Sequence, residues 1–323
     1  MDAFVAQHLR GVSRTYALLI PWLPPPLDGI VGTAYLLMRI VDTLEDAPGL
    51  TPAGRRAALR QLEGVLKGDQ DAATCTLPVA GELEAERRLM RDAAEVLRRV
   101  ASLPEPYRSA AQDCACLMSQ GVRLLLDRSA ERGRPYPAIV DLNELREYCF
   151  YVAGVVGEML CTMMVAHLHL PALRRLRMLA MELGIGLQLV NILKDAGKDA
   201  RQGRRYLPAA EDPAASEAAV YQIALTHARE CLRRGIGYVL ALPPAARELR
   251  TFCGLPIAWG GLTLARAEED SSHAKITRQQ LRSAMDTFAR LAADDDALRA
   301  WLLSTCMPAK MPAPVTCPAE AGR

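Results

Sequence analysis

Along most of the chain, apolar and polar residues are interspersed without the two-residue alternation of a β-strand. Clusters rich in proline or glycine interrupt this pattern, as at "PWLPPPLDG", "SLPEP", "ERGRPYP", "GRRYLP" and "ALPP". The segments between these breaks predict helices: a first that ends near Ile20, a second over Leu27–Asp46, and a third that begins with Thr51 as N-cap and Pro52 in its first turn. Further helices are predicted over Glu82–Val100, Pro106–Leu126, Leu142–His169, Pro171–Ala200, Pro213–Leu240, Ala245–Glu269 and Arg278–Leu303.

The composition supports a single helical core. Half of the 323 residues are hydrophobic, only 5% are aromatic, and the good helix formers Ala, Leu, Arg and Glu are abundant. We find no repeat of solenoid period and no interior linker long enough to separate two domains. The sequence therefore predicts one all-α domain of about ten helices over residues 1–305, followed by a disordered Pro- and Ala-rich tail over residues 306–323. A net charge of +2 gives no support to a nucleic-acid partner.

The cysteines and the chain's N-terminus indicate a cytoplasmic protein. The nine cysteines form no paired CxxC or Cys/His pattern, so we expect reduced, mostly buried thiols and no zinc site. The first residues lack the apolar core of a signal peptide. The stretch most similar to a membrane span is Tyr148–Leu170, but Glu158 lies near its middle, so a centrally buried helix is the better interpretation.

One candidate site is the stretch "NILKDAGKDARQGRRYLP", in which Asp195 and Asp199 are followed by a basic cluster. Helical residues four apart lie about 40° apart around the axis and about 6 Å along it, so these two aspartates share one face. The apolar run "GIGLQLV" comes directly before them. The stretch therefore combines an apolar approach, an acidic pair and a group of arginines.

A second acidic stretch, "AYLLMRIVDTLEDAPG", carries Asp42, Glu45 and Asp46 on one helical face, with Arg39 three residues before Asp42. Each acidic group on its own is also explained by a solvated helix face, or near "APG" by helix-end chemistry. Acids near a helix C-terminus oppose the helix dipole, however, which favours a functional placement.

Two opposed acidic faces are typical of magnesium sites. Magnesium prefers oxygen ligands, and it is usually held by one or two carboxylates while substrate phosphates complete its shell. Neighbouring arginines are suited to the remaining phosphate charge. The pattern predicts a magnesium and diphosphate site beside an apolar pocket for a hydrocarbon.

Five segments resemble the squalene/phytoene synthase family of head-to-head isoprenoid synthases. "YLLMRIVDTLED" and "QLVNILKDAGKDARQGRRYLP" are similar to the two aspartate-rich motifs of the family, and "EYCFYVAGVVG" to a signature between them. "VSRTYALLI" resembles the N-terminal Ser-Arg segment, and "FCGLPIAWGGLTLA" followed by "AKITR" resembles a C-terminal segment. The resemblance covers about Ser13 to Arg278 in the family's order, and it implies an all-α isoprenoid synthase bundle around a deep apolar cavity.

The resemblance also implies roles for individual residues. Magnesium and diphosphate would be held by Asp42, Glu45, Asp46, Asp195 and Asp199, and phosphate would be contacted by Ser13, Arg14, Arg39 and Arg204. Tyr148 matches a tyrosine of the first half-reaction's proton transfer, Gln188 and Asn191 match polar cavity residues, and Tyr35 matches a further aromatic position. From the residues alone, a core aromatic is the favoured explanation of Tyr148. Gly154 and Gly157 predict close approach of a neighbouring helix or ligand, because glycine in a helix costs ~1 kcal/mol.

Within the family, "TFCGLP" and "SRTYALLI" look more similar to the reductive squalene synthase branch. That branch condenses two molecules of farnesyl diphosphate through presqualene diphosphate and reduces the product with NADPH. The basic residues that match its NADPH positions are Arg14, Arg39, Lys194, Lys275 and Arg278. The alternatives are a non-reductive dehydrosqualene or phytoene synthase, a class I cyclase, or a non-catalytic relative, against which the four motif aspartates argue.

This chain departs from the family pattern at Lys198, where the second motif usually has a glutamate. The lysine is suited to pairing with diphosphate or an aspartate, and it also weakens a metal site. No membrane anchor is expected, although an apolar product implies transient peripheral contact with a membrane. The residues carry no indication of oligomeric state.

Overall fold

The helices form between the predicted breaks, and capping side chains fix several of their ends. The computed structural model describes residues 1–13, 15–47, 49–72, 75–134, 136–170, 176–201, 203–209, 217–269 and 274–306. Helix α3 spans Leu27–Asp46, with the predicted bounds, and α4 spans Pro52–Leu66. The Thr51 hydroxyl accepts a hydrogen bond from the Gly54 amide, which confirms the predicted N-cap. Within these described residues the fold is all-α, and an isolated bridge between Ala138 and Arg205 is its β-pairing.

The remaining elements complete the helical fold. They are α1 (Ala3–Val12), α2 (Tyr16–Leu19), η1 (Ile20–Trp22), α5 (Glu84–Arg91), α6 (Ala93–Ala101), α7 (Tyr107–Glu131), α8 (Leu142–Cys149), η2 (Phe150–Gly154), α9 (Val155–Leu168), α10 (Arg177–Arg201), α11 (Glu217–Ala241), α12 (Arg247–Glu269), α13 (Arg278–Leu291) and α14 (Asp295–Cys306).

Three predicted helices are divided in the structure. These divisions were not predicted because the breaks contain neither proline nor glycine. The first predicted helix divides after α1, where the Ser13 hydroxyl accepts a hydrogen bond from the Tyr16 amide. The Glu82–Val100 helix divides at Asp92 into α5 and α6. The last predicted helix divides before α14, where the Asp294 carboxylate accepts a bond from the Ala297 amide. The side chains of Ser13 and Asp294 thus accept bonds from backbone donors and start new helices.

The apolar stretch from α8 to α9 is one nearly continuous helix interrupted by the π-helical turn η2. Among the described residues, Leu142–Leu168 is the one helix that is long and apolar enough to cross a membrane, and 39% of its most apolar window is buried inside the protein. A Cβ atom on Gly157 would lie 2.1 Å from the carbonyl oxygen of Ala180 in α10. This close approach confirms the prediction that Gly157 makes room for a neighbouring helix.

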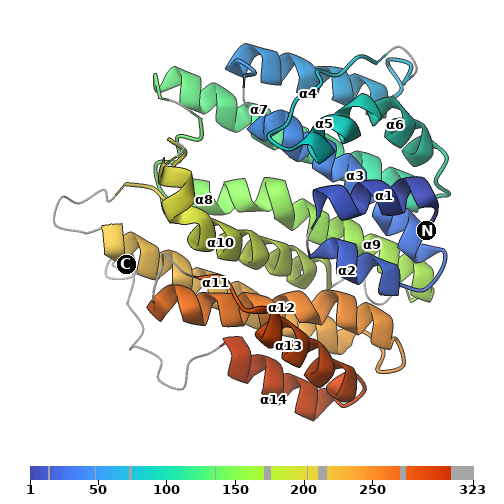
Figure 1. The fold of residues 1–323 in the computed structure, drawn as a ribbon, viewed down its shortest axis with the longest axis vertical. Coiled ribbons are helices and arrows are strands. Elements are labelled where there is room, and N and C mark those ends of the chain that lie inside the picture. The colour runs from blue at the N-terminus through green and yellow to red at the C-terminus, as the bar shows by residue number, and fades with distance from the viewer. Residues whose placement is uncertain are drawn as a thin grey trace, which may run out of the picture.

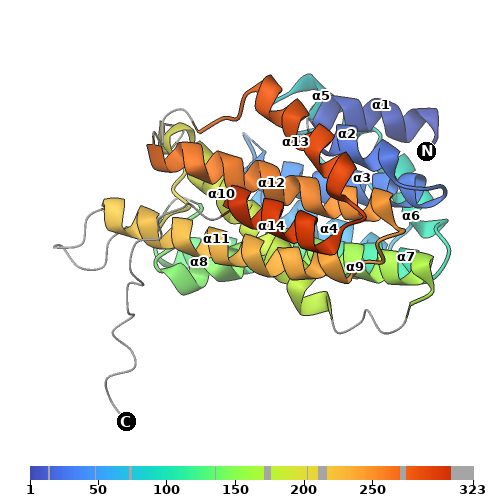
Figure 2. The same ribbon diagram turned by 90° about the horizontal axis from the view of Figure 1, so that it is seen from below.

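Figure 1 shows the helices stacked in layers, with α10 between the α8–α9 helix and the C-terminal helices. Helix α10 packs against α9, α11 and α12, while α3 packs against α1, α6 and α7. Figure 2 shows the same layers from below, with α13 on the side of α1 and α5. The long helices therefore surround a common centre, and the apolar faces of α3 and α10 both contribute to it.

The thiol chemistry agrees with the prediction for the described residues. Their eight cysteines are all free, and Cys114, Cys149, Cys161, Cys231, Cys253 and Cys306 are buried. Helix α14 ends at Cys306, and the predicted tail beyond it lies outside the described residues.

Candidate active site

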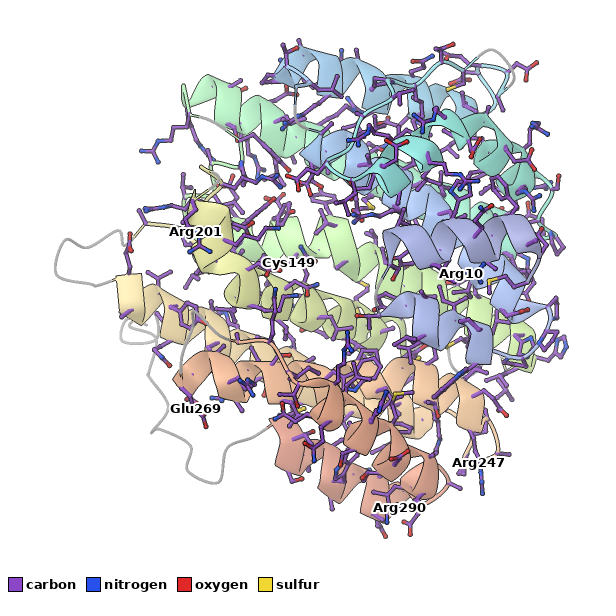
Figure 3. All side chains as sticks on the ribbon, in the orientation of Figure 1. Arg10, Cys149, Arg201, Arg247, Glu269 and Arg290 are labelled. Carbon is purple, nitrogen blue, oxygen red and sulfur yellow. The ribbon has the colours of Figure 1, made fainter. Side chains whose placement is uncertain are left out.

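A cavity of about 660 Å³ lies among α3, α9, α10 and α12. Its apolar wall includes Val31, Met38, Val152, Leu160, Leu183, Leu187, Phe252 and Pro256. Its charged residues come from the C-terminal turns of α3 and α10 and from the segments near them. In Figure 3, Arg201 marks this end of α10, and side chains fill the spaces between the helix layers. The cavity therefore has an acidic end and an apolar interior.

The two predicted acidic faces meet at this end. Asp42 and Asp46 of α3 and Asp195 and Asp199 of α10 all line the cavity. Burial raises the pKa of Asp42 to about 6, with Arg39 opposing the rise and Asp46 adding to it. The pKa of Asp199 is raised by burial and by the charge of Asp195. Both helices thus concentrate negative charge on one space.

Two arginines lie between these carboxylates and a third acidic segment. Arg39 is 2.5 Å from Glu86 and 3.6 Å from Asp42. Arg204 is 3.1 Å from Asp46 and 2.8 Å from Glu82. Among the residues that the structure describes, the buried Nε of Arg39 has no hydrogen-bond partner. This unpaired donor and the paired guanidinium groups are suited to a multivalent anion.

Glu45 has different surroundings from the two aspartates beside it. It is 3% exposed, and its Oε1 accepts hydrogen bonds from the hydroxyls of Tyr136 at 2.5 Å and Tyr148 at 3.1 Å. Burial, followed by the charge of Asp46, raises the pKa of Glu45 to about 8, and the two tyrosine hydroxyls oppose this rise. The ring of Tyr206 lies 5.2 Å from that of Tyr148. Glu45 is therefore the centre of a buried tyrosine cluster.

The other predicted catalytic residues also line the cavity: Tyr35, Gln188 and Asn191. The rings of Tyr35 and Tyr16 lie 5.6 Å apart, and that of Phe252 is 6.0 Å from Tyr16. These three rings form an aromatic strip along the apolar wall. Their π faces are suited to stabilising positive charge that develops on a bound hydrocarbon.

Fewer of the residues predicted to bind phosphate or nucleotide line the cavity. Ser13 does not line the cavity, but a side-chain hydrogen bond links it to Tyr35. Lys194 does not line the cavity, but it contacts two residues that do: it is 3.0 Å from Asn191 and 3.3 Å from Asp195. The remaining predicted nucleotide residues, Lys275 and Arg278, are exposed and absent from the cavity wall, while Arg14 lies outside the described residues.

Several residues of the site were not predicted from the sequence. Tyr206 follows Arg204 by two positions, so its nearness to the second motif was an available signal. Glu82, Glu86 and Tyr136 have no such signal, because folding brings them to the site from remote segments. Lys198, the departure from the family pattern, lines the cavity and counteracts the rise in the pKa of Asp199 that burial causes.

The donor set fits magnesium held jointly with a phosphate ligand. Among the described residues, no three His, Cys, Asp or Glu side chains form a ready-made metal site. Two aspartate pairs facing one space match an ion that takes one or two carboxylates and leaves its other positions to water and phosphate oxygens. The oxygen-only donors and the nearby arginines support this fit.

Comparisons with known proteins agree with this geometry. The family model for squalene/phytoene synthases matches residues 9–287. A probable squalene synthase of Neurospora crassa is 28% identical over 203 residues, which make up 62% of this chain and 41% of that protein. A chloroplastic phytoene synthase of Narcissus pseudonarcissus is 41% identical over 92 residues, which are 28% of this chain and 20% of that protein. The matched segments are thus less than half the length of these curated relatives.

Solved structures show the same fold. TcSQS in complex with the ligand BPH1237 superimposes with a TM-score of 0.79 at 22% identity, covering 97% of this chain and 93% of that chain. The squalene synthase HpnC from Alicyclobacillus acidocaldarius gives a TM-score of 0.55 at 18% identity, covering 83% and 93%. The family match contains both acidic faces and all five segments that carried the resemblance, and this chain belongs to the squalene/phytoene synthase family.

Proposed function

We propose that this protein is a magnesium-dependent squalene synthase. It would join two molecules of farnesyl diphosphate head to head through presqualene diphosphate and reduce the product with NADPH. The observation that carries the proposal is the meeting of Asp42, Asp46, Asp195 and Asp199 at one end of an apolar cavity, beside Arg39 and Arg204. Squalene synthases among the relatives support the choice of reaction.

The charged end of the cavity would bind the diphosphates. The four aspartates would hold magnesium, which when bound supplies positive charge to the leaving diphosphate. Arg39 and Arg204 would exchange Glu86 and Glu82 for phosphate oxygens, because both pairs lie at the cavity wall. Negative charge grows on the leaving oxygen as the C–O bond breaks, so these fixed charges stabilise the departing diphosphate more than the bound ester, which is the requirement for catalysis.

The apolar interior would protect the reacting carbons. Departure of diphosphate leaves an allylic cation, which must meet the double bond of the second substrate before it meets water. An enclosed apolar wall excludes that water. The ring of Tyr35 is suited to stabilising the cation. The Tyr148 oxygen is a candidate acceptor for the proton lost in the first half-reaction, and its own hydroxyl proton would pass to the Glu45 carboxylate to which it donates.

A non-reductive function competes with the reductive one proposed above. Arg39 is the one described residue of the predicted NADPH set that lines the cavity, and NADPH when bound supplies hydride. The dispersed positions of Lys194, Lys275 and Arg278 favour the second candidate, a non-reductive dehydrosqualene or phytoene synthase. The high local identity to a phytoene synthase is a further observation in its favour.

A product analysis with and without NADPH separates the two candidates. We expect squalene from farnesyl diphosphate, magnesium and NADPH. Without NADPH we expect presqualene diphosphate, alcohols or dehydrosqualene. Mass spectrometry of the extracts identifies the products. The same hydrocarbon in both reactions would move the protein to the non-reductive branch, with Lys198 as the first residue to exchange for glutamate.

The proposal includes a location. We propose a cytoplasmic protein that contacts a membrane transiently, because an apolar product has to leave the cavity for a lipid phase.

A further inference from the structure

Tyr136 lies outside the cavity wall, yet it contacts the residue that holds Tyr148. Its hydroxyl donates a hydrogen bond to Oε1 of Glu45 at 2.5 Å. The same oxygen accepts the hydroxyl of Tyr148 at 3.1 Å, and Tyr148 does line the cavity. One carboxyl oxygen therefore joins a tyrosine behind the wall to a tyrosine in it.

The loop that carries Tyr136 is tied down on two sides. The Ala138 amide donates to the Ser129 hydroxyl at 3.2 Å, and Arg132 donates to the Ala138 carbonyl at 2.8 Å, which fixes the loop to the end of α7. Ala138 also forms the β-bridge with Arg205, which lies between Arg204 and Tyr206 in the chain. Tyr136 is thus anchored through Ala138, two residues along the chain.

This anchor determines what the Tyr148 oxygen offers to the cavity. Oε1 of Glu45 accepts hydrogen bonds whether the carboxyl is charged or neutral, since a carbonyl oxygen is an acceptor in both forms. The Tyr148 hydroxyl donates to Glu45 and shares a further side-chain hydrogen bond with Tyr206, so Glu45 helps to fix how the Tyr148 oxygen faces the cavity. Without Tyr136, the Glu45 carboxyl would lose one of the two bonds that fix its orientation.

We propose that Tyr136 is a positioning residue for Tyr148, acting through Glu45. The proposal rests on the proposed function for its catalytic consequence, although the positioning itself is independent of it. A purely structural Tyr136 would support the protein's stability and leave the Tyr148 oxygen in place. The two roles differ in whether the effect of Tyr136 requires the hydroxyl of Tyr148.

A double-mutant cycle with matched controls tests this role. The variants are Tyr136→Phe, Tyr148→Phe, the double variant, and Tyr151→Phe as a control from the same family signature that does not line the cavity. Each keeps its aromatic bulk, and circular dichroism checks that each folds. Rates of presqualene diphosphate formation and crystal structures of the wild type and single variants are the two measurements.

We expect Tyr136→Phe to lower kcat about tenfold with little change in KM, and to have no further effect once Tyr148 is phenylalanine. We also expect the Tyr148–Glu45 contact to be displaced in the Tyr136→Phe crystal and retained in the Tyr151→Phe crystal. Independent, multiplicative effects of the two substitutions would overturn the proposal, as would an unmoved Tyr148. A wild-type protein without condensation activity would refute the proposed function alone, because the crystals still decide the positioning.

Discussion

Replacing either acidic face should nearly abolish turnover while the fold survives. We expect Asp42→Asn and Asp195→Asn each to lower kcat by about 100-fold or more, the size found when one electrostatic contact to a transition state is removed. Asparagine keeps the shape of the side chain and removes the charge that would hold magnesium. Steady-state kinetics with farnesyl diphosphate at saturating magnesium measure the effect.

Asp113→Asn is the matched control for these variants, because Asp113 is exposed on α7 and does not line the cavity. It should keep the wild-type rate. Near-normal turnover of Asp42→Asn or Asp195→Asn would exclude that face as a metal site. Loss of the helical circular dichroism signal would instead mean that the carboxylate supports folding.

The second large effect is expected for Tyr148→Phe. The substitution removes the hydroxyl that Glu45 holds and keeps the ring, so binding should change little. We expect formation of presqualene diphosphate to slow about 100-fold. Loss of a general acid or base typically costs ~10²–10⁴-fold in rate, and the expected effect lies at the lower end of that range. Rapid-quench experiments that follow the intermediate measure this step.

Presqualene diphosphate supplied directly to the Tyr148→Phe variant should still be converted at close to the wild-type rate. This arm separates the first half-reaction from the second. Accumulation of the intermediate by the variant would place Tyr148 in the second half-reaction and contradict the role given to it here.

Local signals predicted the parts of the fold that depend on local chemistry. The bounds of α3 follow from the proline-rich break before Leu27 and the "APG" break after Asp46, and the structure has the same bounds. The cap at Thr51 follows from its own hydroxyl. The divisions at Ser13, Asp92 and Asp294 were missed because these polar residues also occur on the exposed faces of unbroken helices, so their sequence signal is ambiguous.

In the site, too, local patterns could be predicted from the sequence and long-range contacts could not. The two aspartate pairs were visible because each is local to one helix, and the structure brings both to one cavity. Glu86 pairs with Arg39 across 47 positions, and Tyr136 contacts Glu45 across 91. Contacts of that separation depend on how helices pack, and no spacing within a single helix predicts them. The placement of Glu45 among tyrosines is likewise a property of the packed structure.

The central claim is that two prenyl diphosphates are joined at the cavity where the two acidic faces meet. Mass spectrometry of the diphosphate fraction after incubation with farnesyl diphosphate and magnesium, with NADPH withheld, tests it most directly. The account predicts presqualene diphosphate that carries the carbon of two farnesyl groups, and its loss when a chelator removes the metal. Recovery of unreacted farnesyl diphosphate, or of a product with only one farnesyl group, would contradict it.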